Sequence, residues 1–600
     1  MRRHRLFNLD PLSQRMPRLG PLVKKPLEKM LALNDINGIY DRVVAADASA
    51  HTFSEKCLQD MNVSVKVSAA DLERIPRTGP LVVVANHPFG GVEGLILASV
   101  LLKVRPDYKC MVNHILGTIP HMRPICVFVD PFGTNKAMNA KGLKECLSLL
   151  RNGGCLGVFP SGEVSHLRWG TRRVEDPKWS THIGGLIRRT GAAVIPVYFE
   201  GRNGPIFQMA GLIHPRLRTA MLPRATLNRR HTTCSLQIGR LISPREIGAF
   251  STDQGVADYL RNRTYALSSR RGESMSLARK VLGTVGLKKR SRPATIVSPA
   301  DPATLTHELN PAKLMAANGE LRCYLVDAAT SPSILNEIGR LREITFRAVG
   351  EGTGRSLDLD EFDITYKHLL VWNAEKHELV GGYRLGLSDE LVAAKGLAGL
   401  YTQTLFDLTP RFLHTFNPAI ELGRSFVRPE YQRGFSPLML LWKGIGAFIA
   451  QNPRYRYLFG PVSISNAYSP LSRALIVNFL WRGENRHELS RFIRPRTPHK
   501  FAKHVAKRAQ MLAGPLETLD DVTDLVSDIE PDGKAVPILL KQYRKLGAKS
   551  LGFNVDPAFG QCLDCLFVLD LLSADNRSAD RYMGREHNTA YRAFHATAAI

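Results

Sequence analysis

Two stretches of the chain show apolar runs of strand length that alternate with patterns of helix length. In the first stretch, the fully apolar run at 81–85 predicts a buried strand, and the pattern at 92–103 predicts the helix after it. The other strands predicted here lie at 125–129, 156–159 and 194–199, and the other helices at 141–151 and 183–190, followed by Gly153 and Gly191. Alternation of this kind indicates an α/β domain.

The second stretch begins near Leu321 and predicts another α/β domain. Its predicted elements are a strand at 323–326, a helix at 334–346 and strands near 379–387, 420–427 and 457–462. Residues 286–312 combine lysine and arginine with several prolines, which is the composition of a linker. We therefore divide the chain into a basic, partly helical segment at 1–60, an α/β domain at 61–285, a basic proline-containing linker at 286–318, a second α/β domain at 319–572 and a polar, frayed tail at 573–600.

The composition is that of a globular protein with a large excess of positive charge. Of the 600 residues, 44% are hydrophobic and 22% are charged, and the formal net charge is +27. The length favours two or three domains. The charge would attract nucleic acid, an anionic membrane surface or an acidic protein. Because the sequence has no helix-turn-helix, zinc or RNA-binding signature, nucleic acid is the least favoured partner.

The sequence contains no apolar run that is long enough to span a bilayer, and no apolar core of a secretion signal follows its basic start. We therefore expect a cytoplasmic protein that lies on the inner face of the cytoplasmic membrane. Near the N-terminus, apolar and basic residues recur at helical spacing. They are Leu22, Val23, Leu27, Met30 and Leu31, with Lys24, Lys25 and Lys29. Such a helix either lies on a membrane surface or packs on the first domain, and both interpretations stay open.

The nine cysteines are scattered and odd in number, which is typical of reduced thiols. Cys562 and Cys565 have the spacing of a zinc or redox pair, but the chain offers no second pair. Cys565 lies in the apolar run 563–572, and Cys562 directly precedes it. We therefore predict a buried structural pair and no metal site there.

A candidate catalytic pair follows the first predicted strand. Residues 86–93 read Asn-His-Pro-Phe-Gly-Gly-Val-Glu, a tight turn between a strand and a helix. Such a turn presents side chains to the crevice at the carboxyl edge of an α/β sheet, where ligands bind. Histidine suits a general base near neutral pH, and a nearby carboxylate can orient it. The sequence therefore indicates His87 as the base and Glu93 as its partner.

Two later motifs extend this pattern, Val-Phe-Pro-Ser-Gly-Glu-Val-Ser at 158–165 and Val-Ile-Pro-Val at 194–197. Together the motifs make residues 60–245 resemble the glycerolipid O-acyltransferase family, which includes the lysophosphatidate acyltransferases. The resemblance implies the same roles for His87 and Glu93. It also implies an acyl carrier protein or coenzyme A thioester as cosubstrate and no metal or other cofactor. The acceptor would be bound by Ser161, Gly162 and Glu163.

Two departures from that family concern the acceptor. Glu93 lies one residue later than the usual aspartate, and its longer side chain can compensate for the extra glycine. In the third motif, Ser161 and Val164 stand where the family has a glutamate and an arginine. Because arginine is well suited to phosphate, its loss argues against a phosphate-bearing acceptor. Glu163 either meets an ammonium group or only caps a turn.

A second ordered set of charged residues lies in the C-terminal half, within 341–346, 360–363, 382–385 and 421–427. In this order the set resembles the acyl-homoserine lactone synthases and the ornithine-lipid N-acyltransferases, which share the GCN5-related N-acyltransferase fold. The residues on the signature positions are Arg342, Phe346, Asp360, Asp363, Arg384, Glu421 and Arg424. The predicted fold is thus a glycerolipid-acyltransferase-like α/β domain followed by a GCN5-related N-acyltransferase-like α/β domain. The resemblance implies a carrier-protein donor and an amino-acid amine as acceptor.

The chemistry of N-acylation agrees with this set. An α-amine is largely protonated at neutral pH and must lose a proton before it attacks a thioester. Glu421 is the candidate base, directly or through a water molecule. Asp360 and Asp363 suit a cationic acceptor, and Arg384 or Arg424 can hold its carboxylate. The alternative is that these charges form only an internal network of salt bridges.

The basic surface has two candidate partners, the carrier protein that donates the acyl chain and an anionic membrane. Arg433 and Gly434 lie in a degraded coenzyme A loop at 432–436, and the degradation favours a carrier protein over free coenzyme A. Carrier proteins and inner-leaflet lipids are both acidic. A further basic cluster consists of Arg216, Arg218, Arg224, Arg229 and Arg230, interleaved with Leu217, Met221 and Leu222. It suits a membrane interface, and the alternative is an exposed, solvated loop.

The order of the two domains resembles that of the bifunctional ornithine lipid synthases. On this hypothesis, the second domain acylates the α-amine of an amino acid such as ornithine, glycine, lysine or glutamine with a 3-hydroxyacyl chain. The first domain then esterifies the 3-hydroxyl. One alternative is a lysophospholipid or 1-acylglycerol-3-phosphate acyltransferase with a regulatory second domain. Another is a basic scaffold that binds membranes or nucleic acid.

Overall fold

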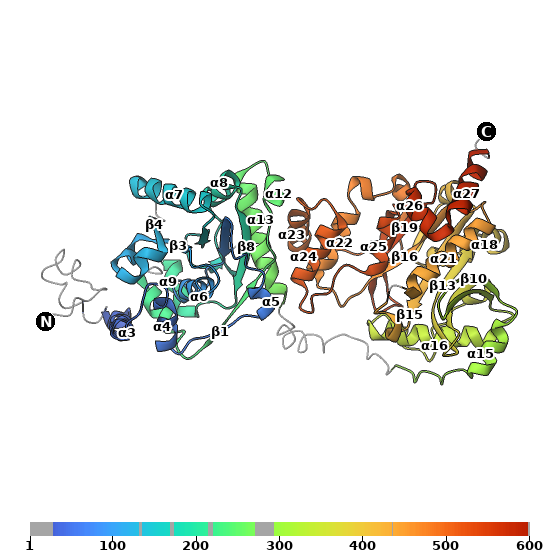
Figure 1. The fold of residues 1–600 in the computed structure, drawn as a ribbon, viewed down its shortest axis with the longest axis horizontal. Coiled ribbons are helices and arrows are strands. Elements are labelled where there is room, and N and C mark those ends of the chain that lie inside the picture. The colour runs from blue at the N-terminus through green and yellow to red at the C-terminus, as the bar shows by residue number, and fades with distance from the viewer. Residues whose placement is uncertain are drawn as a thin grey trace. The chain divides into compact units, whose positions relative to one another are not determined.

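The computed structural model describes residues 24, 28–130, 135–168, 173–213, 220–270, 293–434 and 436–597 (Figure 1). The chain forms two compact units, one made chiefly of residues up to Gly272 and the other chiefly of residues from Glu273 onward. Each unit is an α/β domain built around its own sheet, as the sequence predicts. Within the described residues, no helix combines the length and the apolar character needed to cross a bilayer.

The sheet of the first domain has seven strands among the described residues, in the order β1-β9-β8-β2-β5-β3-β4. These are β1 (Ser64–Lys66), β2 (Leu81–Ala85), β3 (Tyr108–Asn113), β4 (Cys126–Val129), β5 (Cys155–Val158), β8 (Ala193–Phe199) and β9 (Thr233–Ile238). β2 lies in the middle and pairs in parallel with β5 and β8. Its residues are at most 1% exposed, as expected of a central parallel strand. A small hairpin, β6 (His166–Arg168) and β7 (Arg173–Glu175), follows β5.

Helices cover both faces of this sheet. They are α3 (Leu33–Ala45), α4 (Phe53–Asp60), α5 (Ala69–Leu72), α6 (Val92–Leu101), η1 (His114–Thr118), η2 (Pro120–Ile125), α7 (Lys136–Arg151), α8 (Thr181–Thr190), α9 (Pro205–Ile213), α11 (Leu222–Leu227), α12 (Pro244–Gly248), α13 (Asp253–Ala266) and η3 (Leu267–Arg270). On one face, Leu81 and Val83 join a core with Phe53 of α4 and Leu97 of α6. α13 packs on β2 and β8, and α7 packs on β5. The strands and helices predicted for this domain are confirmed, with ends that shift by a few residues.

The start of the described chain packs on the first domain. Ile39 and Val43 of α3 are buried in the same core as β2. Leu31 is also buried, whereas Met30 is 51% exposed. The other apolar residues of the predicted N-terminal helix, Leu22, Val23 and Leu27, lie outside the described residues, as does Lys25.

The sheet of the second domain has eight strands among the described residues, in the order β10-β11-β12-β13-β15-β16-β19-β18. These are β10 (Lys313–Asn318), β11 (Leu321–Asp327), β12 (Lys367–Asn373), β13 (Glu378–Leu387), β15 (Ala419–Val427), β16 (Tyr457–Ile464), β18 (Lys549–Asp556) and β19 (Cys562–Asp570). Neighbouring strands are antiparallel except β15 and β16, which are parallel. Two short strands, β14 (Phe406–Leu408) and β17 (Ile493–Pro495), pair with each other.

Two long helices cover opposite faces of this sheet (Figure 1). Leu370 of β12 contacts the core under α16 (Pro332–Ala348), whereas Leu369 lies beside Gly444 of α21 (Ser436–Gln451). The other helices are α15 (Pro302–Leu309), α17 (Phe362–Thr365), α18 (Ser388–Lys395), η4 (Gly396–Gly399), α19 (Thr402–Leu405), α20 (Pro410–Phe416), η5 (Pro429–Tyr431), α22 (Pro470–Leu480), η6 (Gly483–Asn485), η7 (Glu488–Phe492), α23 (Lys503–Ala513), α24 (Leu519–Ile529) and α25 (Ile538–Lys545). The elements predicted for this domain are confirmed, and the predicted pair Cys562 and Cys565 is buried on β19.

The C-terminal residues correct one expectation. Instead of fraying, the tail forms α26 (Asn576–Met583) and α27 (Arg585–Thr597). Tyr591 is 2% exposed, and its hydroxyl donates to the carbonyl of Tyr455 at 3.2 Å. A few apolar residues at helical spacing are therefore enough to pack this polar segment on the domain.

The parallel pair β15 and β16 separates soon after it forms. Their register covers only Ala419–Glu421 and Tyr457–Phe459. Beyond that point β15 bulges, because Arg424 and Ser425 together face Tyr383 of β13. Arg424 adopts a left-handed backbone with φ 53°, which costs free energy for a residue with a side chain. The strand backbone after Glu421 is therefore not paired with β16.

Gly460→Ala should destabilise the second domain, because a Cβ at Gly460 would collide with the carbonyl oxygen of Leu422 where β15 and β16 separate. Overpacking of this kind costs about 1–3 kcal/mol. Calorimetry of the full chain should show a lower unfolding temperature for this domain. Gly423→Ala is the matched control, since its Cβ would meet no atom within 4 Å. An unchanged unfolding temperature in Gly460→Ala would contradict the close approach.

Candidate active sites

The first candidate site lies where β2 ends and α6 begins. His87 Nδ1 is 2.8 Å from Glu93 Oε1, and the two side chains are 18% and 0% exposed. The ring of His87 also stacks on Phe159, with the ring centroids 4.5 Å apart. Because Nδ1 faces the carboxylate, Nε2 is the ring atom that can take a proton from an acceptor. The structure therefore brings the predicted pair into the geometry of a dyad.

The turn between His87 and Glu93 holds the carboxylate. The amides of Phe89 and Gly90 donate to Glu93 Oε1 at 2.8 and 2.7 Å, and the amide of Gly91 donates to Oε2 at 3.0 Å. Gly90 has φ +100°, which favours glycine at this position. The long glutamate side chain thus folds back onto the amides of its own turn. This accounts for the acid lying one residue later than in the resembling family.

Each member of the pair stabilises the charged form of the other. Burial alone would raise the pKa of Glu93, but His87 and the turn amides hold this pKa below its ordinary value. Burial alone would lower the pKa of His87, but the carboxylates of Glu93 and Asp176 raise it above its ordinary value. The imidazole of His87 is therefore more basic than an ordinary histidine, which suits the predicted role of a base.

Asp176 is a site residue that the sequence did not reveal. Its Oδ1 accepts from the backbone amide of His87 at 3.2 Å and from the hydroxyl of Ser165, and its Oδ2 accepts from Trp179 Nε1 at 2.9 Å. The amide of Ser165 donates to the carbonyl of His87 at 2.7 Å. Burial raises the pKa of Asp176 above its ordinary value. Asp176 therefore positions the backbone of His87 from a segment that no motif marks.

Asn86 locks the same turn to the neighbouring strand. Its side chain donates to the carbonyl of Phe199 at 3.0 Å and accepts from the amide of Phe199 at 2.7 Å. Asn203 donates from its side chain to the carbonyl of Phe89 at 2.9 Å. These contacts connect the ends of β2 and β8, so the histidine is carried by two adjacent parallel strands.

The third motif forms a turn beside this site. The hydroxyl of Ser161 donates to the carbonyl of Glu163 at 2.8 Å, Gly162 has φ +63°, and Glu163 is exposed. Val164 is 5% exposed and packs with Phe207 and Ala225. A Cβ placed on Gly90 would lie 2.9 Å from the Val164 side chain. An apolar residue therefore lies beside the dyad turn, at the position where the resembling family has an arginine.

Part of the predicted basic cluster adjoins this turn. Arg216, Leu217 and Arg218 lie outside the described residues. The guanidinium of Arg229 lies 4.0 Å from the centre of the Phe89 ring, and Met221 and Leu222 pack on the cluster around Val164. These three side chains are therefore partly buried against the domain, and the role of the cluster at a membrane stays a prediction.

The second candidate site is a buried network of arginines and aspartates. Arg342 lies 2.7 Å from Asp363, and Arg384 lies 2.5 Å from Asp360 and 3.1 Å from Asp363. Arg424 lies 3.2 Å from Asp360. Burial works against the ionised form of Asp363, but Arg342 and Arg384 hold its pKa well below the ordinary value. The two aspartates that the sequence assigns to a cationic acceptor are thus already paired with arginines.

Glu421 is held by four donors. The hydroxyl of Tyr366 donates to Oε2 at 2.6 Å, the amide of Tyr401 donates to Oε2 at 3.1 Å, and the amide and hydroxyl of Thr402 donate to Oε1 at 2.6 and 2.5 Å. Glu421 is 1% exposed, and burial raises its pKa above the ordinary value despite these donors. Tyr366, Tyr401 and Thr402 were not indicated by the sequence. The role of Glu421 as a base stays a prediction.

Arg424 and two aromatic rings complete this site. The guanidinium of Arg424 donates to the hydroxyl of Tyr401 at 3.1 Å and lies 4.2 Å from the centre of the Phe559 ring. Phe346 of α16 lies with its ring 5.5 Å from that of Phe559. Arg424 also lies 3.5 Å from Asp358, a partner that the sequence did not indicate.

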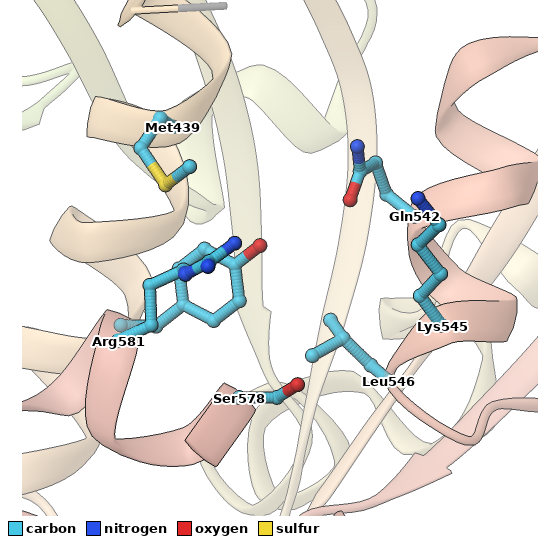
Figure 2. Close-up of a pocket in the computed structure, with 7 residues that line it drawn as sticks. Met439, Gln542, Lys545, Leu546, Ser578 and Arg581 are labelled. Atoms are coloured by element: carbon cyan, nitrogen blue, oxygen red, sulfur yellow. The ribbon is translucent and has the colours of Figure 1, made fainter.

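The predicted donor residues Arg433 and Gly434 are exposed between η5 and α21. A pocket of about 280 Å³ lies among α21, α25 and α26 (Figure 2). Its lining consists of Met439, Gln542, Lys545, Leu546, Ser578, Arg581 and Tyr582. None of these residues belongs to the charged network, so this pocket is separate from the second candidate site.

Comparisons with known proteins agree with the two domains. The Acyltransferase family model matches residues 13–269, and the model of the Acetyltransferase (GNAT) domain matches residues 341–443. A glycine N(alpha)-acyltransferase of Phocaeicola vulgatus is 33% identical over 282 residues, which are 44% of this chain and 85% of that protein.

Two further relatives represent the two kinds of acyl transfer. A lyso-glycine lipid O-acyltransferase of Phocaeicola vulgatus is 26% identical over 36% of this chain and 77% of that protein. An L-ornithine N(alpha)-acyltransferase of Rhodobacter capsulatus is 27% identical over 38% of this chain and 80% of that protein. The chain is an acyltransferase that belongs to the GNAT-type N(alpha)-acyltransferase family and carries an additional acyltransferase domain on the same polypeptide.

Proposed function

We propose that this chain makes an ornithine-type amino-acid lipid by two successive acylations. The second domain transfers a 3-hydroxyacyl chain from acyl carrier protein to the α-amine of an amino acid. The first domain then acylates the 3-hydroxyl of that product. The observation that carries the proposal is the presence of two separate sites on one chain, the dyad of His87 and Glu93 and the buried network around Glu421.

In the O-acylation, His87 Nε2 takes the proton of the 3-hydroxyl as its oxygen attacks the thioester carbonyl. The carbon–sulfur bond then breaks, and the departing thiolate takes the proton from His87. Glu93 stabilises the imidazolium that forms between these steps, as its contact of 2.8 Å with Nδ1 allows. Asp176 holds the backbone of His87 throughout.

The surroundings of the dyad favour an acceptor without phosphate. Val164 is buried in an apolar cluster beside Gly90, where an arginine would be needed for a phosphate group. A lyso-lipid of an amino acid presents a hydroxyl on an apolar chain and needs no phosphate contact. This observation supports amino-acid lipid as the product over a phospholipid.

In the N-acylation, the separation of β15 from β16 offers a place for the thioester arm of the donor. The backbone of β15 beyond Glu421 is not paired with β16, so an extended arm could bond to it as an added strand would. An arm bound in this way would bring the thioester near Glu421, which would accept the amine proton directly or through water. Of the two arginines considered for the acceptor carboxylate, Arg424 is favoured, because its side chain is 11% exposed and that of Arg384 is 0% exposed.

The net charge of +27 supports acidic partners. We propose acyl carrier protein as donor, with the exposed Arg433 as one of its contacts, and coenzyme A thioester as the less favoured donor. The same charge supports binding to the anionic inner face of the cytoplasmic membrane, where lyso-lipid is found.

Expression of the chain in a bacterial host without amino-acid lipids should yield both mono- and diacylated products by lipid mass spectrometry. His87→Ala should retain the monoacyl lipid and lower the rate of diacyl formation about 10²–10⁴-fold, because the hydroxyl acceptor loses its base. His182→Ala, an exposed histidine on α8, is the matched control. Unchanged diacyl lipid in His87→Ala would remove this residue from the mechanism.

Glu93→Gln should lower the O-acylation rate and shift its acid limb to lower pH. Glu93 raises the pKa of His87, so its neutralisation lowers that pKa, and the neutral imidazole then persists at lower pH. The plateau rate should fall about 10²–10⁴-fold, because the imidazolium loses its stabilising charge. The measurement is the rate of esterification of added lyso-lipid against pH, with the surface variant Glu145→Gln as control. A fall in rate without a shift of the acid limb would argue against the dyad.

Glu421→Gln should lose N-acylation at neutral pH while esterification of added lyso-lipid continues. If Glu421 accepts the amine proton, higher pH should restore part of the rate, because more of the acceptor amine is then neutral. The measurement is the rate of N-acylation against pH with saturating carrier-protein thioester. A proportional loss at every pH would instead make Glu421 an anchor for Tyr401 and Thr402.

A further inference from the structure

The second domain contains three buried carboxylates outside the arginine–aspartate network. Glu351, Asp556 and Asp564, here called the acidic cluster, are 7%, 5% and 5% exposed. Ser463 of β16 pairs directly with Asp564 of β19, and the hydroxyl of Ser463 donates to Glu351 at 2.8 Å. Glu351 and Asp564 therefore meet at the same end of the sheet.

Asp556 joins them from the edge strand β18. It pairs with Cys562, two residues before Asp564 on β19, so both aspartates point to the same face as diagonal neighbours. Burial, with the charges of Asp556 and Glu351, raises the pKa of Asp564 well above its ordinary value. Burial likewise raises the pKa of Glu351, and the charge of Asp556 adds to the effect. The ionised forms of Asp564 and Glu351 are thus destabilised, and a bound cation would stabilise them.

At Asp564 the described part of the chain supplies no strong donor, whereas Asp556 Oδ1 already accepts from the amides of Ala558 and Phe559 at 2.8 and 3.2 Å. Asp564 Oδ1 lies 3.6 Å from the thiol of Cys562, a weak donor, and Oδ2 is buried without a hydrogen-bond partner among the described residues. Arg424 is the guanidinium that acts on Asp564, but it already lies 3.5 Å from Asp358 and 3.2 Å from Asp360. A buried carboxylate oxygen without a donor indicates a ligand that supplies one.

Tyr401 connects this cluster to Glu421. Its backbone amide donates to Glu421 at 3.1 Å, and its hydroxyl donates to Asp556 at 3.4 Å. The acidic cluster and the predicted α-amine base are thus separated by the length of one tyrosine side chain. The α-amine and the terminal amine of a diamino acid such as ornithine are separated by a similar length of chain.

We propose that Glu351, Asp556 and Asp564 bind the side-chain ammonium group of the amino-acid acceptor and so select a diamino acid. The inference rests on the proposed N-acylation and adds the site that recognises the second amine. An ammonium ion carries three donors, and Asp564 offers it a buried oxygen without a donor. Among the described residues, no group of three His, Cys, Asp or Glu side chains is arranged to hold a metal ion.

The test compares acceptors that differ only in the terminal amine. The purified full chain is assayed for N-acylation with 3-hydroxyacyl carrier-protein thioester and with ornithine, lysine, norvaline or glycine. Norvaline is ornithine without its terminal amine. The expected kcat/KM for ornithine is about 10- to 100-fold above that for norvaline, the usual size of a hydrogen bond to a charged group.

Asp564→Asn, Asp556→Asn and Glu351→Gln should raise the KM for ornithine and bring the ornithine-to-norvaline ratio close to one. Their loss of rate with norvaline should be smaller than with ornithine, because norvaline has no terminal amine for the cluster to bind. Asp520→Asn is the matched control, since that side chain is 74% exposed. Equal losses with every acceptor would show a structural role and overturn the proposal.

If a variant fails to fold, binding of acceptors to the wild-type protein tests the proposal. Ornithine, and not norvaline, should raise its unfolding temperature in the absence of donor. Norvaline or glycine acylated as well as ornithine would overturn the acidic-cluster site while N-acylation stands. No acylation of any amine would overturn the proposed function itself, and this site with it.

Discussion

Both candidate sites depend on buried carboxylates that are held in place by nearby donors and cations. A carboxylate that leaves water is destabilised as an anion unless donors or cations replace its hydration. At Glu93 the donors are amides of the turn that carries His87, so the same contacts that stabilise the charge also shape the turn. The dyad and its local backbone therefore form one unit, and neither can change without the other.

The second domain stabilises its buried carboxylates mainly with side chains. Arg342 and Arg384 neutralise Asp363, and Glu421 is surrounded by the hydroxyls and amides of three residues. These contacts connect α16, α17, α19, β13 and β15 around the point where β15 and β16 separate. The same residues can therefore form both a network of salt bridges and a reaction centre. Charges that are held rigidly beside the unpaired backbone of β15 can also position a donor and an acceptor.

The sequence predicted what is local and continuous. The apolar run of β2 and the spacing of His87 and Glu93 can be read within one short segment. β3 and β9 were missed because only one of their faces is deeply buried, so apolar and polar residues are mixed. Asp176 was missed because its contact with His87 spans 89 residues and depends on how the chain returns to the sheet. The C-terminal tail was expected to fray, since the few apolar residues that pack it are sparse in a polar segment.

The two sequential acylations that we propose would give a physical reason to place both sites on one chain. The intermediate would carry a single acyl chain, and one chain holds a molecule on a membrane only reversibly. An intermediate that dissociates is diluted before it reaches a second enzyme. On the proposed function, a second site on the same polypeptide would be close wherever the first one acts, which would raise its effective concentration for the intermediate without any new contact. The positive charge of the chain would act in the same direction, because attraction to an anionic surface keeps both sites where the lyso-lipid resides.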